Sequence, residues 1–321
     1  MEFAAYPSYM LRIGLISAAT YKYMDQEVRH GSHHGTAFAA TFNGFDPAEV
    51  AKHKWTFVRA TKRIPECKVV NVWDKDRTWA QRLAKACNIP NVCNNPEDCS
   101  KGVDAVVIID DGSGAQSKYA FHPLSKGIPT FCDKPLAMTA KEAHKVVQAA
   151  RKKRAKFMSA SSLRFVPDIV KLRDDLHKLG GVHLAQAICG NELVYYGIHA
   201  LSMVYAVLGG GAISAVNVGQ PGLNTVRIRF RGHLDVVLMV GERDWMRAGY
   251  QISVFGKKGW ETIKPNLKDL YYYLLQEFIS YVGNSREPYP MEQEVELIAA
   301  LEAGKRSLQL GREVTIAEVL K

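Results

Sequence analysis

The sequence contains no long apolar run. Among its 321 residues, no stretch of about eighteen consecutive apolar residues could cross a bilayer as a helix. Residues 1–10 also lack the basic-then-apolar pattern of a secretory signal. These absences predict a soluble, cytoplasmic protein with no membrane partner. The length allows two domains with separate cores.

Cysteine pairs at short spacing are also missing. The chain has six cysteines, and Cys87, Cys93 and Cys99 recur at even intervals rather than as Cys-x-x-Cys. This spacing predicts reduced thiols and neither a disulfide framework nor a structural zinc site.

The positive charge of the chain is scattered rather than gathered. The formal net charge is +10, and the one dense basic run is Arg151–Arg154. That run falls at the end of a predicted helix, where cations interact favourably with the helix dipole. We therefore expect no nucleic-acid partner. The sequence also contains no internal repeat and no low-complexity linker.

The first part of the chain alternates strand and helix patterns. Short apolar runs predict buried strands, and Thr139-x-x-Glu142 resembles the start of a capped helix over 139–154. Strands that alternate with helices favour right-handed crossovers and a parallel sheet. The predicted strands are 11–16, 69–72, 105–109 and 130–132.

The pattern changes after about residue 160. Val226, Ile228 and Phe230 alternate with arginines, and the apolar run 236–240 follows, which is typical of a mostly antiparallel sheet with one core face. The arginines could serve a dimer contact or an anion, but solvated cross-strand pairing is the simpler interpretation. A final helix places apolar residues on one stripe, which predicts core packing; these residues are Leu297, Leu301, Gly304 and Leu308.

A charged tripeptide, Asp133-Lys134-Pro135, follows the apolar run 128–132. The whole stretch 127–137 resembles the Glu-Lys-Pro segment of the Gfo/Idh/MocA oxidoreductases, which are sugar and polyol dehydrogenases with a Rossmann domain. The resemblance extends over most of the chain; its further segments are 163–167, 197–199 and 288–314.

The resemblance implies an α/β Rossmann domain over 1–135, with insertions near 20–34 and 43–65. An α+β domain with a large, mostly antiparallel open sheet follows over 136–321. Helix 139–154, and as a further candidate the C-terminal segment, would pack back on the first domain. The sheet would carry a homo-oligomer, either a dimer or a tetramer.

The glycine-rich turn that a dinucleotide fold needs after its first strand is degraded. By the resemblance, the positions of the three fingerprint glycines hold Ser17, Ala19 and Lys22. Lys22 or Arg29 could replace lost amide contacts by pairing with phosphate, or the long loop could close over the cofactor. In the second insertion, Trp55 and Phe57 would form an additional flap.

Three histidines in the first insertion suggest a metal site, since imidazole binds transition metals. However, the adjacent His33 and His34 cannot easily face one point, and no carboxylate or cysteine has a supporting spacing to them or to His30. We therefore expect no metal.

Acidic residues follow the second and third predicted strands. Asp74 ends the second strand, where a carboxylate can bind the adenosine ribose and repel a 2′-phosphate, which favours NAD. NADP is not excluded, because Lys75 and Arg77 follow; Asp76 suits a helix cap. The resemblance places Asp110 and Asp111 on the nicotinamide side, as cofactor or polyol ligands or as a helix cap. Asp133 and Lys134 complete the predicted cofactor edge.

The catalytic prediction rests on His199. Tyr195-Tyr196-Gly197-Ile198-His199 matches the family's Asp-x-Gly-x-His motif, in which the histidine serves as base, while Lys134 orients the substrate hydroxyl. Tyr195 replaces the motif's aspartate, so His199 should be less basic, and either Tyr195 joins the proton relay or the chemistry differs. Arg164 and Tyr196 are substrate-binding candidates; the alternative for Arg164 is an interdomain salt bridge.

These residues predict an oxidoreductase dependent on NAD(P), acting on a secondary hydroxyl of a sugar, glycoside or cyclitol. Two alternatives stay open. One is a lyase or glycosidase that retains NAD and oxidises its sugar transiently. The other is a non-enzymatic ligand sensor or scaffold, suggested by the loss of the fingerprint glycines.

Overall fold

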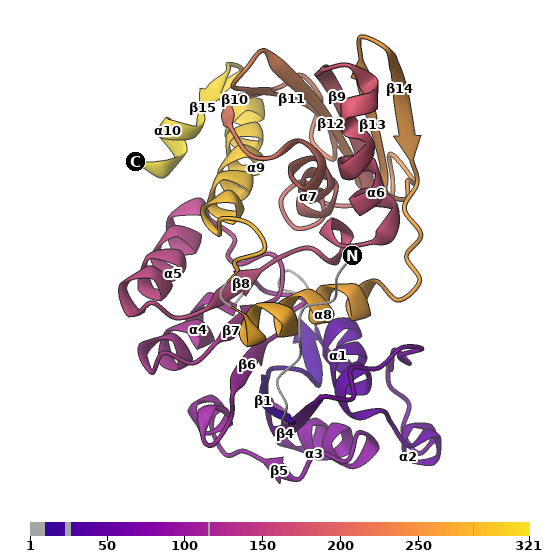
Figure 1. Cartoon of the computed structure of the whole chain (residues 1–321), viewed down its shortest axis with the longest axis vertical. Helices are drawn as coiled ribbons and strands as arrows, with labels where there is room; N and C mark the ends of the chain where they lie inside the picture. Colours follow the sequence, from indigo (N-terminus) through magenta and orange to yellow (C-terminus); the bar gives the residue numbers. More distant parts are fainter. Residues whose placement is uncertain (1–9, 23–26, 115, 285) are drawn as a thin grey trace. The chain divides into compact units, whose positions relative to one another are not determined.

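The computed structural model describes residues 10–22, 27–114, 116–284 and 286–321 and divides the chain into two compact units (Figure 1). The first unit holds the described residues up to Leu136, with Val146–Ser159 and Tyr271–Pro290. The second holds Ala137–Lys145, Ala160–Leu270 and Met291–Lys321. Each unit is therefore built from three stretches of the chain.

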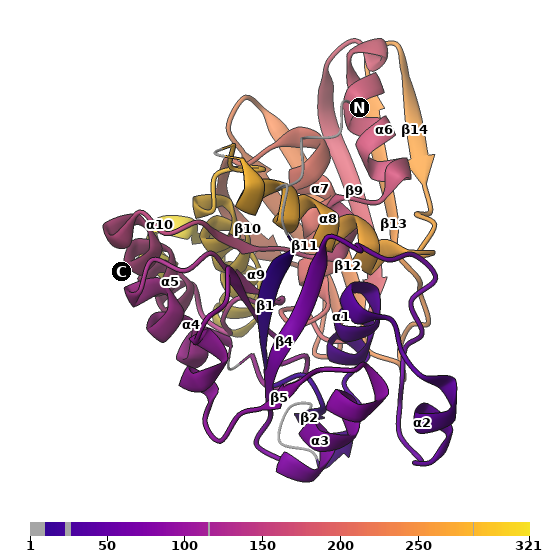
Figure 2. The same cartoon turned by 60° about the horizontal axis from the view of Figure 1, so that its bottom comes forward.

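The first unit is organised on a parallel sheet of order β5-β4-β1-β6-β7-β8. Figure 2 shows β1 and β4 side by side. The chain order runs outward in opposite directions from β1 and β6, so the switch point of the sheet lies between these two strands. The strands are β1 (Leu11–Ile16), β4 (Cys67–Trp73), β5 (Asn91–Val92), β6 (Ala105–Ile108), β7 (Thr130–Cys132) and β8 (Phe157–Ser159).

The predicted strands 11–16 and 130–132 coincide with β1 and β7, and the other two differ only at their ends. Residues of β6 and β7 are buried throughout, as expected for parallel strands covered on both faces.

Helices of the first unit begin where the sequence supplies caps. The Asp76 carboxylate accepts hydrogen bonds from the Thr78 and Trp79 amides at the start of α3, which confirms its predicted capping role. The elements are α1 (His33–Asn43), α2 (Pro47–Ala51), α3 (Arg77–Ala86), η1 (Pro96–Ser100), α4 (Gln116–Ser125), α5 (Ala140–Lys153), of which residues 146–153 belong to this unit, and α8 (Leu270–Gly283).

The first insertion lengthens the connection between β1 and α1. It contains the antiparallel strands β2 (Thr20–Lys22) and β3 (Val28–His30), and residues 23–26 between them lie outside the described part of the chain.

The second insertion contains α2 and a set of packed aromatic rings. The Trp55 ring lies 5.1 Å from Phe57 and 5.4 Å from Trp79 between centroids, and its indole N–H donates to the Val50 carbonyl. These rings are held against α3, the helix that carries Trp79.

The second unit is organised on a mixed sheet of order β14-β13-β9-β12-β11-β10-β15, in which only the β9–β12 pair is parallel among the described strands. The parallel sheet of the first unit and this mostly antiparallel one confirm the predicted fold class. The strands are β9 (Val182–Gly190), β10 (Ala212–Asn217), β11 (Leu223–Phe230), β12 (Leu234–Gly241), β13 (Gln251–Gly256), β14 (Gly259–Ile263) and β15 (Val314–Thr315).

The alternation predicted for β11 is present. Val226 and Ile228 are buried, whereas Arg227 forms an ion pair with Asp235 at 2.8 Å on the neighbouring strand. Arg229 lies 3.6 Å from a carboxylate oxygen of Glu313. Arg227 and Arg229 therefore pair with nearby carboxylates, as the simpler interpretation of the sequence expected.

Helices pack on one face of this sheet. The predicted stripe of the last long helix is core at three of its four positions, since Leu297 and Leu301 are buried and a Cβ on Gly304 would lie 2.9 Å from Val226, whereas Leu308 is half-buried. Among the described residues, no helix is both long and apolar enough to span a membrane. The elements are η2 (Ser162–Arg164), α6 (Pro167–Asp175), η3 (Leu176–Leu179), α7 (Gly197–Leu208), α9 (Glu292–Leu310) and α10 (Ile316–Leu320).

All six cysteines are free thiols, and five of them are buried. Burial raises the pKa of Cys67, Cys87 and Cys189 to about 12, so these thiols stay protonated and act as small apolar side chains.

The packing of α1 on the end of β1 depends on Gly35. A Cβ at this position would lie 1.9 Å from the Ala18 carbonyl oxygen, so Gly35→Ala should lower the free energy of unfolding by at least about 1–3 kcal/mol. Urea unfolding measures the change. Gly249→Ala is the matched control, because no atom lies within 4 Å of its Cβ. Equal stability of the two variants would contradict this close packing.

Candidate active site

Several predicted site residues lie along the carboxyl edge of the parallel sheet. Parallel strands end at one edge, so the residues that follow β1, β4, β6 and β7 gather there. The predicted residues at this edge are Ser17, Ala19, Asp74, Asp110, Asp111, Asp133 and Lys134.

A cluster of buried charged side chains occupies the edge beside β6 and β7. The His34 Nδ1 atom lies 2.6 Å from an Asp133 carboxylate oxygen, and Asp133 and Lys134 are 1% and 3% exposed. The neighbouring Asp111 accepts hydrogen bonds at Oδ2 from the Ser32 hydroxyl and the His34 amide, at 3.0 and 3.2 Å. The sequence placed Asp111, Asp133 and Lys134 here; the structure adds Ser32 and His34.

Burial shifts the ionisation of this cluster. Desolvation lowers the pKa of Lys134, although the Asp133 and Asp111 carboxylates oppose the shift. Desolvation likewise raises the pKa of Asp111, against the influence of His34. A lysine ammonium in such surroundings gives up its proton more easily than one in water.

Asp111 is incompletely satisfied. Its Oδ1 atom is buried and has no hydrogen-bond partner among the described residues. A buried acceptor without a donor costs about 1–3 kcal/mol, so the unpaired Oδ1 atom lowers the free energy of unfolding.

Asp74 is held by internal hydrogen bonds, and its predicted ribose contact stays a prediction. Its Oδ2 accepts from the Ala19 and Thr20 amides at 3.0 and 3.1 Å, and its Oδ1 accepts from the Thr20 hydroxyl and the Asp76 amide at 2.6 and 2.9 Å. With four internal donors on two oxygens, the carboxylate anchors the β1–β2 turn.

The assignment of Lys22 to the third fingerprint position is corrected. Lys22 ends β2, inside the inserted hairpin, whereas Gly35 in the first turn of α1 makes the close approach to Ala18 that such a glycine provides. The inserted strands β2 and β3 separate the first two positions, Ser17 and Ala19, from the third along the chain, so the usual spacing points to Lys22. The sequence offered a signal in Ser32-x-x-Gly35, a helix cap followed by a small residue.

Asp110 stabilises its own turn. Its carboxylate accepts from the Gly112 and Ser113 amides and contacts the Ser113 hydroxyl. It therefore holds the loop after β6 in shape. The helix cap considered for this residue is replaced by a tight turn ahead of α4.

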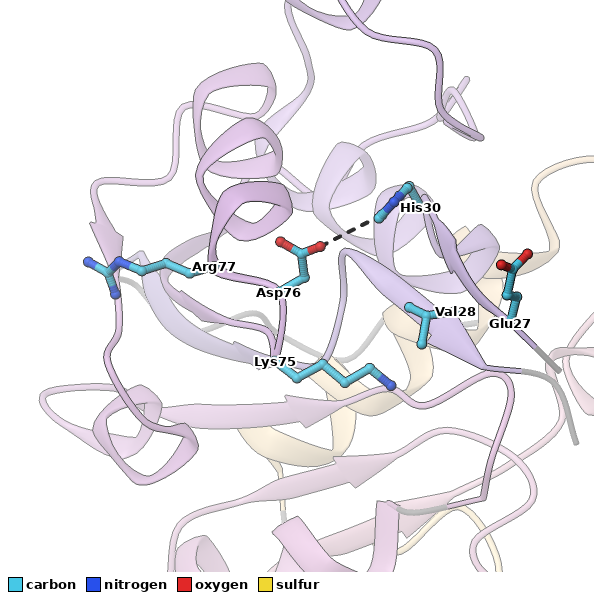
Figure 3. A pocket seen from close by; sticks show the side chains of 6 residues that line it. All are labelled: Glu27, Val28, His30, Lys75, Asp76 and Arg77. Atoms are coloured by element: carbon cyan, nitrogen blue, oxygen red, sulfur yellow. Dashed lines mark ion pairs between the residues drawn. The ribbon is translucent and has the colours of Figure 1, made fainter. Parts of the chain in front are cut away.

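A pocket of about 660 Å³ opens between the inserted strands and the turn after β4 (Figure 3). His30 stacks on Trp79 at 4.3 Å between ring centroids and lies 3.8 Å from an Asp76 oxygen. The lining residues are Glu27, Val28, His30, Lys75, Asp76 and Arg77.

The three histidines of the insertion do not converge. His30 stacks on Trp79, His34 pairs with Asp133, and His33 lies edge-on to Tyr21 at 6.4 Å. Within the part of the chain that is described, no group of three or more His, Cys, Asp or Glu residues could hold a metal ion.

In the second unit, His199 lies in the first turn of α7. Its Nδ1 atom is 2.8 Å from the Ser161 hydroxyl, and the side chain is buried between the Tyr196 and Tyr250 rings, at 5.8 and 5.3 Å between centroids. The contact with Ser161 fixes the orientation of the imidazole. Nothing in the sequence singled out Ser161 from its neighbouring serines.

Two further candidates are also buried in the second unit. Tyr195 is 2% exposed and packs against Tyr196 at 5.5 Å. Arg164 lies 3.7 Å from Glu294 and donates to Gln293 at 3.0 Å. Because these partners belong to the same unit, this ion pair is not the interdomain bridge that the sequence suggested.

Some features of this edge suit a bound dinucleotide and others do not. The switch point and the close packing of α1 at Gly35 are those of a dinucleotide fold. The Ala19, Thr20 and His34 amides that would serve a pyrophosphate, however, already donate to Asp74 and Asp111.

Replacing Asp74 should loosen the β1–β2 turn. Asp74→Asn removes the charge and leaves one acceptor oxygen for four donors, so unfolding free energy should fall by roughly 1.5–3 kcal/mol in a urea titration. Asp46→Asn is the matched control, because Asp46 caps the short helix α2 and asparagine caps equally well. Unchanged stability of Asp74→Asn would show that its oxygens are available to a ligand.

Comparison with known proteins finds a family match over part of the chain. Residues 30–161 match the GFO_IDH_MocA oxidoreductase family, described as having an NAD-binding Rossmann fold. A trans-1,2-dihydrobenzene-1,2-diol dehydrogenase from Bos taurus is 30% identical over 162 residues, 49% of this chain and 48% of the relative. The rhizopine catabolism protein MocA from Rhizobium meliloti is 33% identical over 70 residues, 21% and 22% of the two chains. The chain thus matches about half or less of the length of these curated relatives.

Solved structures share the fold of the whole chain. A probable dehydrogenase from Thermotoga maritima superposes with a TM-score of 0.77 at 17% identity, covering 96% of this chain and 100% of the other. A myo-inositol dehydrogenase from Lactobacillus casei in complex with NAD(H) and myo-inositol superposes at 0.74 with 16% identity, covering 95% and 96%. Residues 30–161, which include the Asp133-Lys134-Pro135 edge, thus match the NAD-binding Rossmann segment of the Gfo/Idh/MocA oxidoreductases, and the chain shares the fold of these dehydrogenase structures.

Proposed function

We propose that this protein is an NAD-dependent oxidoreductase that acts on a secondary hydroxyl of a cyclic polyol, such as a cyclitol or a sugar. The relatives named above act, by their names, on a ring diol and on an inositol. Both are six-membered rings with neighbouring hydroxyls, and we extend that chemical class to this chain. NADP is not excluded.

The observation that carries the proposal is the buried Lys134 ammonium at the carboxyl edge of the sheet. A dehydrogenase must bind an alcohol and stabilise the charge that develops on its oxygen. Lys134 is 3% exposed and has two carboxylates, Asp133 and Asp111, in its electrostatic surroundings. In this role it would donate a hydrogen bond to the reacting hydroxyl.

His199 is the proposed base. Its Nδ1 atom contacts the Ser161 hydroxyl, so proton exchange with a substrate would use Nε2. Nicotinamide, when bound, accepts the hydride. Tyr195 and Tyr196 would supply hydroxyls in place of the family's aspartate, and Arg164 would bind a substrate oxygen.

A second candidate function is a ligand sensor without turnover. The internal engagement of the Ala19 and Thr20 amides by Asp74 favours it, because those donors would otherwise serve a nucleotide. The two candidates differ in whether nicotinamide is reduced.

Oxidation should depend on Lys134 and His199. With NAD and a panel of cyclitols and cyclic trans-diols, we expect Lys134→Met and His199→Asn each to lower kcat/KM roughly 10²–10⁴-fold. Lys126→Met and His183→Asn, both exposed, are the matched controls. Ser161→Ala, which removes the contact with His199 Nδ1, should also lower kcat/KM.

The same assay tests the Lys134 ionisation. Since burial lowers the pKa of Lys134 and the ammonium is the proposed donor, the rate should fall as pH rises through a value below 10.5. Nucleotide binding without reduction of nicotinamide, indifferent to Lys134→Met, would favour the sensor instead.

We also propose that the protein is a homo-oligomer through the open face of the second unit's sheet. On this face Phe255 pairs in register with Leu184 on one side and Trp260 on the other, and all three side chains are exposed. A contiguous apolar row of this kind suits a second copy of the same surface across a two-fold axis.

Light scattering after size-exclusion chromatography tests the assembly. We expect a dimer or tetramer for the wild type and dissociation by Trp260→Lys, because burying a lysine opposite a second copy is costly. Trp245→Lys is the matched control, since Trp245 is exposed but lies outside the row. A monomeric wild type would refute the assembly.

A further inference from the structure

We propose that Asp111 is an internal competitor for the pyrophosphate of a bound dinucleotide, and that it sets the affinity of this protein for NAD. The inference rests on the proposed function, since it concerns the same site. It concerns the acceptors to which the phosphate-binding amides donate when no nucleotide is bound.

In an open α/β sheet the pyrophosphate lies at the switch point, against the amides of the first loop and the N-terminus of the following helix. Here the switch point lies between β1 and β6, and the helix is α1, which begins after its cap Ser32. The amides in question therefore lie in residues 17–20 and in the first turn of α1.

Asp111 reaches this position from the turn after β6. Its Oδ2 atom accepts from the His34 amide, in the first turn of α1, and from the Ser32 hydroxyl. A carboxylate in this position makes the contacts that an anionic ligand would make with a helix N-terminus.

The loop side of the site is engaged in the same way. Asp74 accepts from the Ala19 and Thr20 amides, so both the loop and the start of α1 have amides that already donate to a carboxylate. The backbone at Lys22 also packs tightly against the turn after β6, since a Cβ on Gly112 would lie 2.1 Å from the Lys22 carbonyl oxygen.

An incoming pyrophosphate could displace the Asp111 carboxylate from its hydrogen bonds more easily than the Asp74 carboxylate. All four of the contacts described for Asp74 are with groups of its own turn or of the β1–β2 turn, whereas the Asp111 Oδ1 atom is buried without a partner among the described residues. An incoming pyrophosphate would repel both charges, but only Asp111 leaves behind a helix N-terminus that can receive it.

The unpaired Oδ1 atom also permits the opposite role. A hydroxyl or amide of the ligand could donate to it, and Asp111 would then strengthen binding. We favour competition because the Oδ2 atom already holds the donor that a phosphate needs.

Titration of NAD and NADH into the full-length protein, by calorimetry and by NADH fluorescence, tests the proposal. Relative to the wild type, Asp111→Asn and Asp111→Ala should each bind NAD and NADH about tenfold more tightly. Each variant allows the pyrophosphate one more charge-assisted hydrogen bond and removes one charge repulsion, which together correspond to a change of this size. Asp110→Asn is the matched control, because this neighbouring carboxylate holds its own turn and no amide of α1. Circular dichroism verifies that each variant is folded.

Tighter binding by both Asp111 variants, without the same gain in Asp110→Asn, supports the competition. Equal or weaker binding by the Asp111 variants overturns it, and weaker binding would make Asp111 a ligand. The proposed function is judged separately, by reduction of NAD with a polyol at saturating cofactor. The oxidoreductase function can be refuted even if the Asp111 variants bind NAD more tightly. It can also be confirmed even if those variants show no gain in affinity.

Discussion

The carboxyl edge of the first unit depends on how buried carboxylates are satisfied by backbone amides. Asp74 takes four donors on two oxygens and thereby fixes the turn that leaves β1. A charge that is 3% exposed is tolerated only because those donors replace water. This turn leads into the strands β2 and β3, which precede α1 and the His34 amide that donates to Asp111.

The second constraint is the burial of Lys134. An ammonium excluded from water keeps its charge only beside negative charge, and Asp133 and Asp111 supply it. Asp133 in turn lies 2.6 Å from the His34 imidazole. Catalysis of the proposed kind benefits from this arrangement, because a desolvated donor interacts strongly with a developing alkoxide and needs little reorganisation.

Some functional residues had signals in the sequence and others had none. Lys134 and His199 lie in motifs with fixed spacing, and the predicted strands 11–16 and 130–132 coincide with observed ones. Ser161 could not be found, because a hydroxyl 38 positions before its histidine becomes a partner only through the packing of η2 against α7. Gly35 lies outside the usual spacing of the fingerprint because the strands β2 and β3 stand between β1 and α1.

Apolar periodicity and cap residues in the sequence by themselves determined the parallel sheet, the mostly antiparallel sheet and the core stripe of α9, since local pattern dictates which faces are buried. The Asp133-Lys134-Pro135 motif could also be recognised from the sequence, because it lies within one short segment. Only the tertiary structure decided what the acidic residues do. A carboxylate binds whichever donors the fold brings to it, and for Asp74 and Asp111 those donors come from loops tens of positions away.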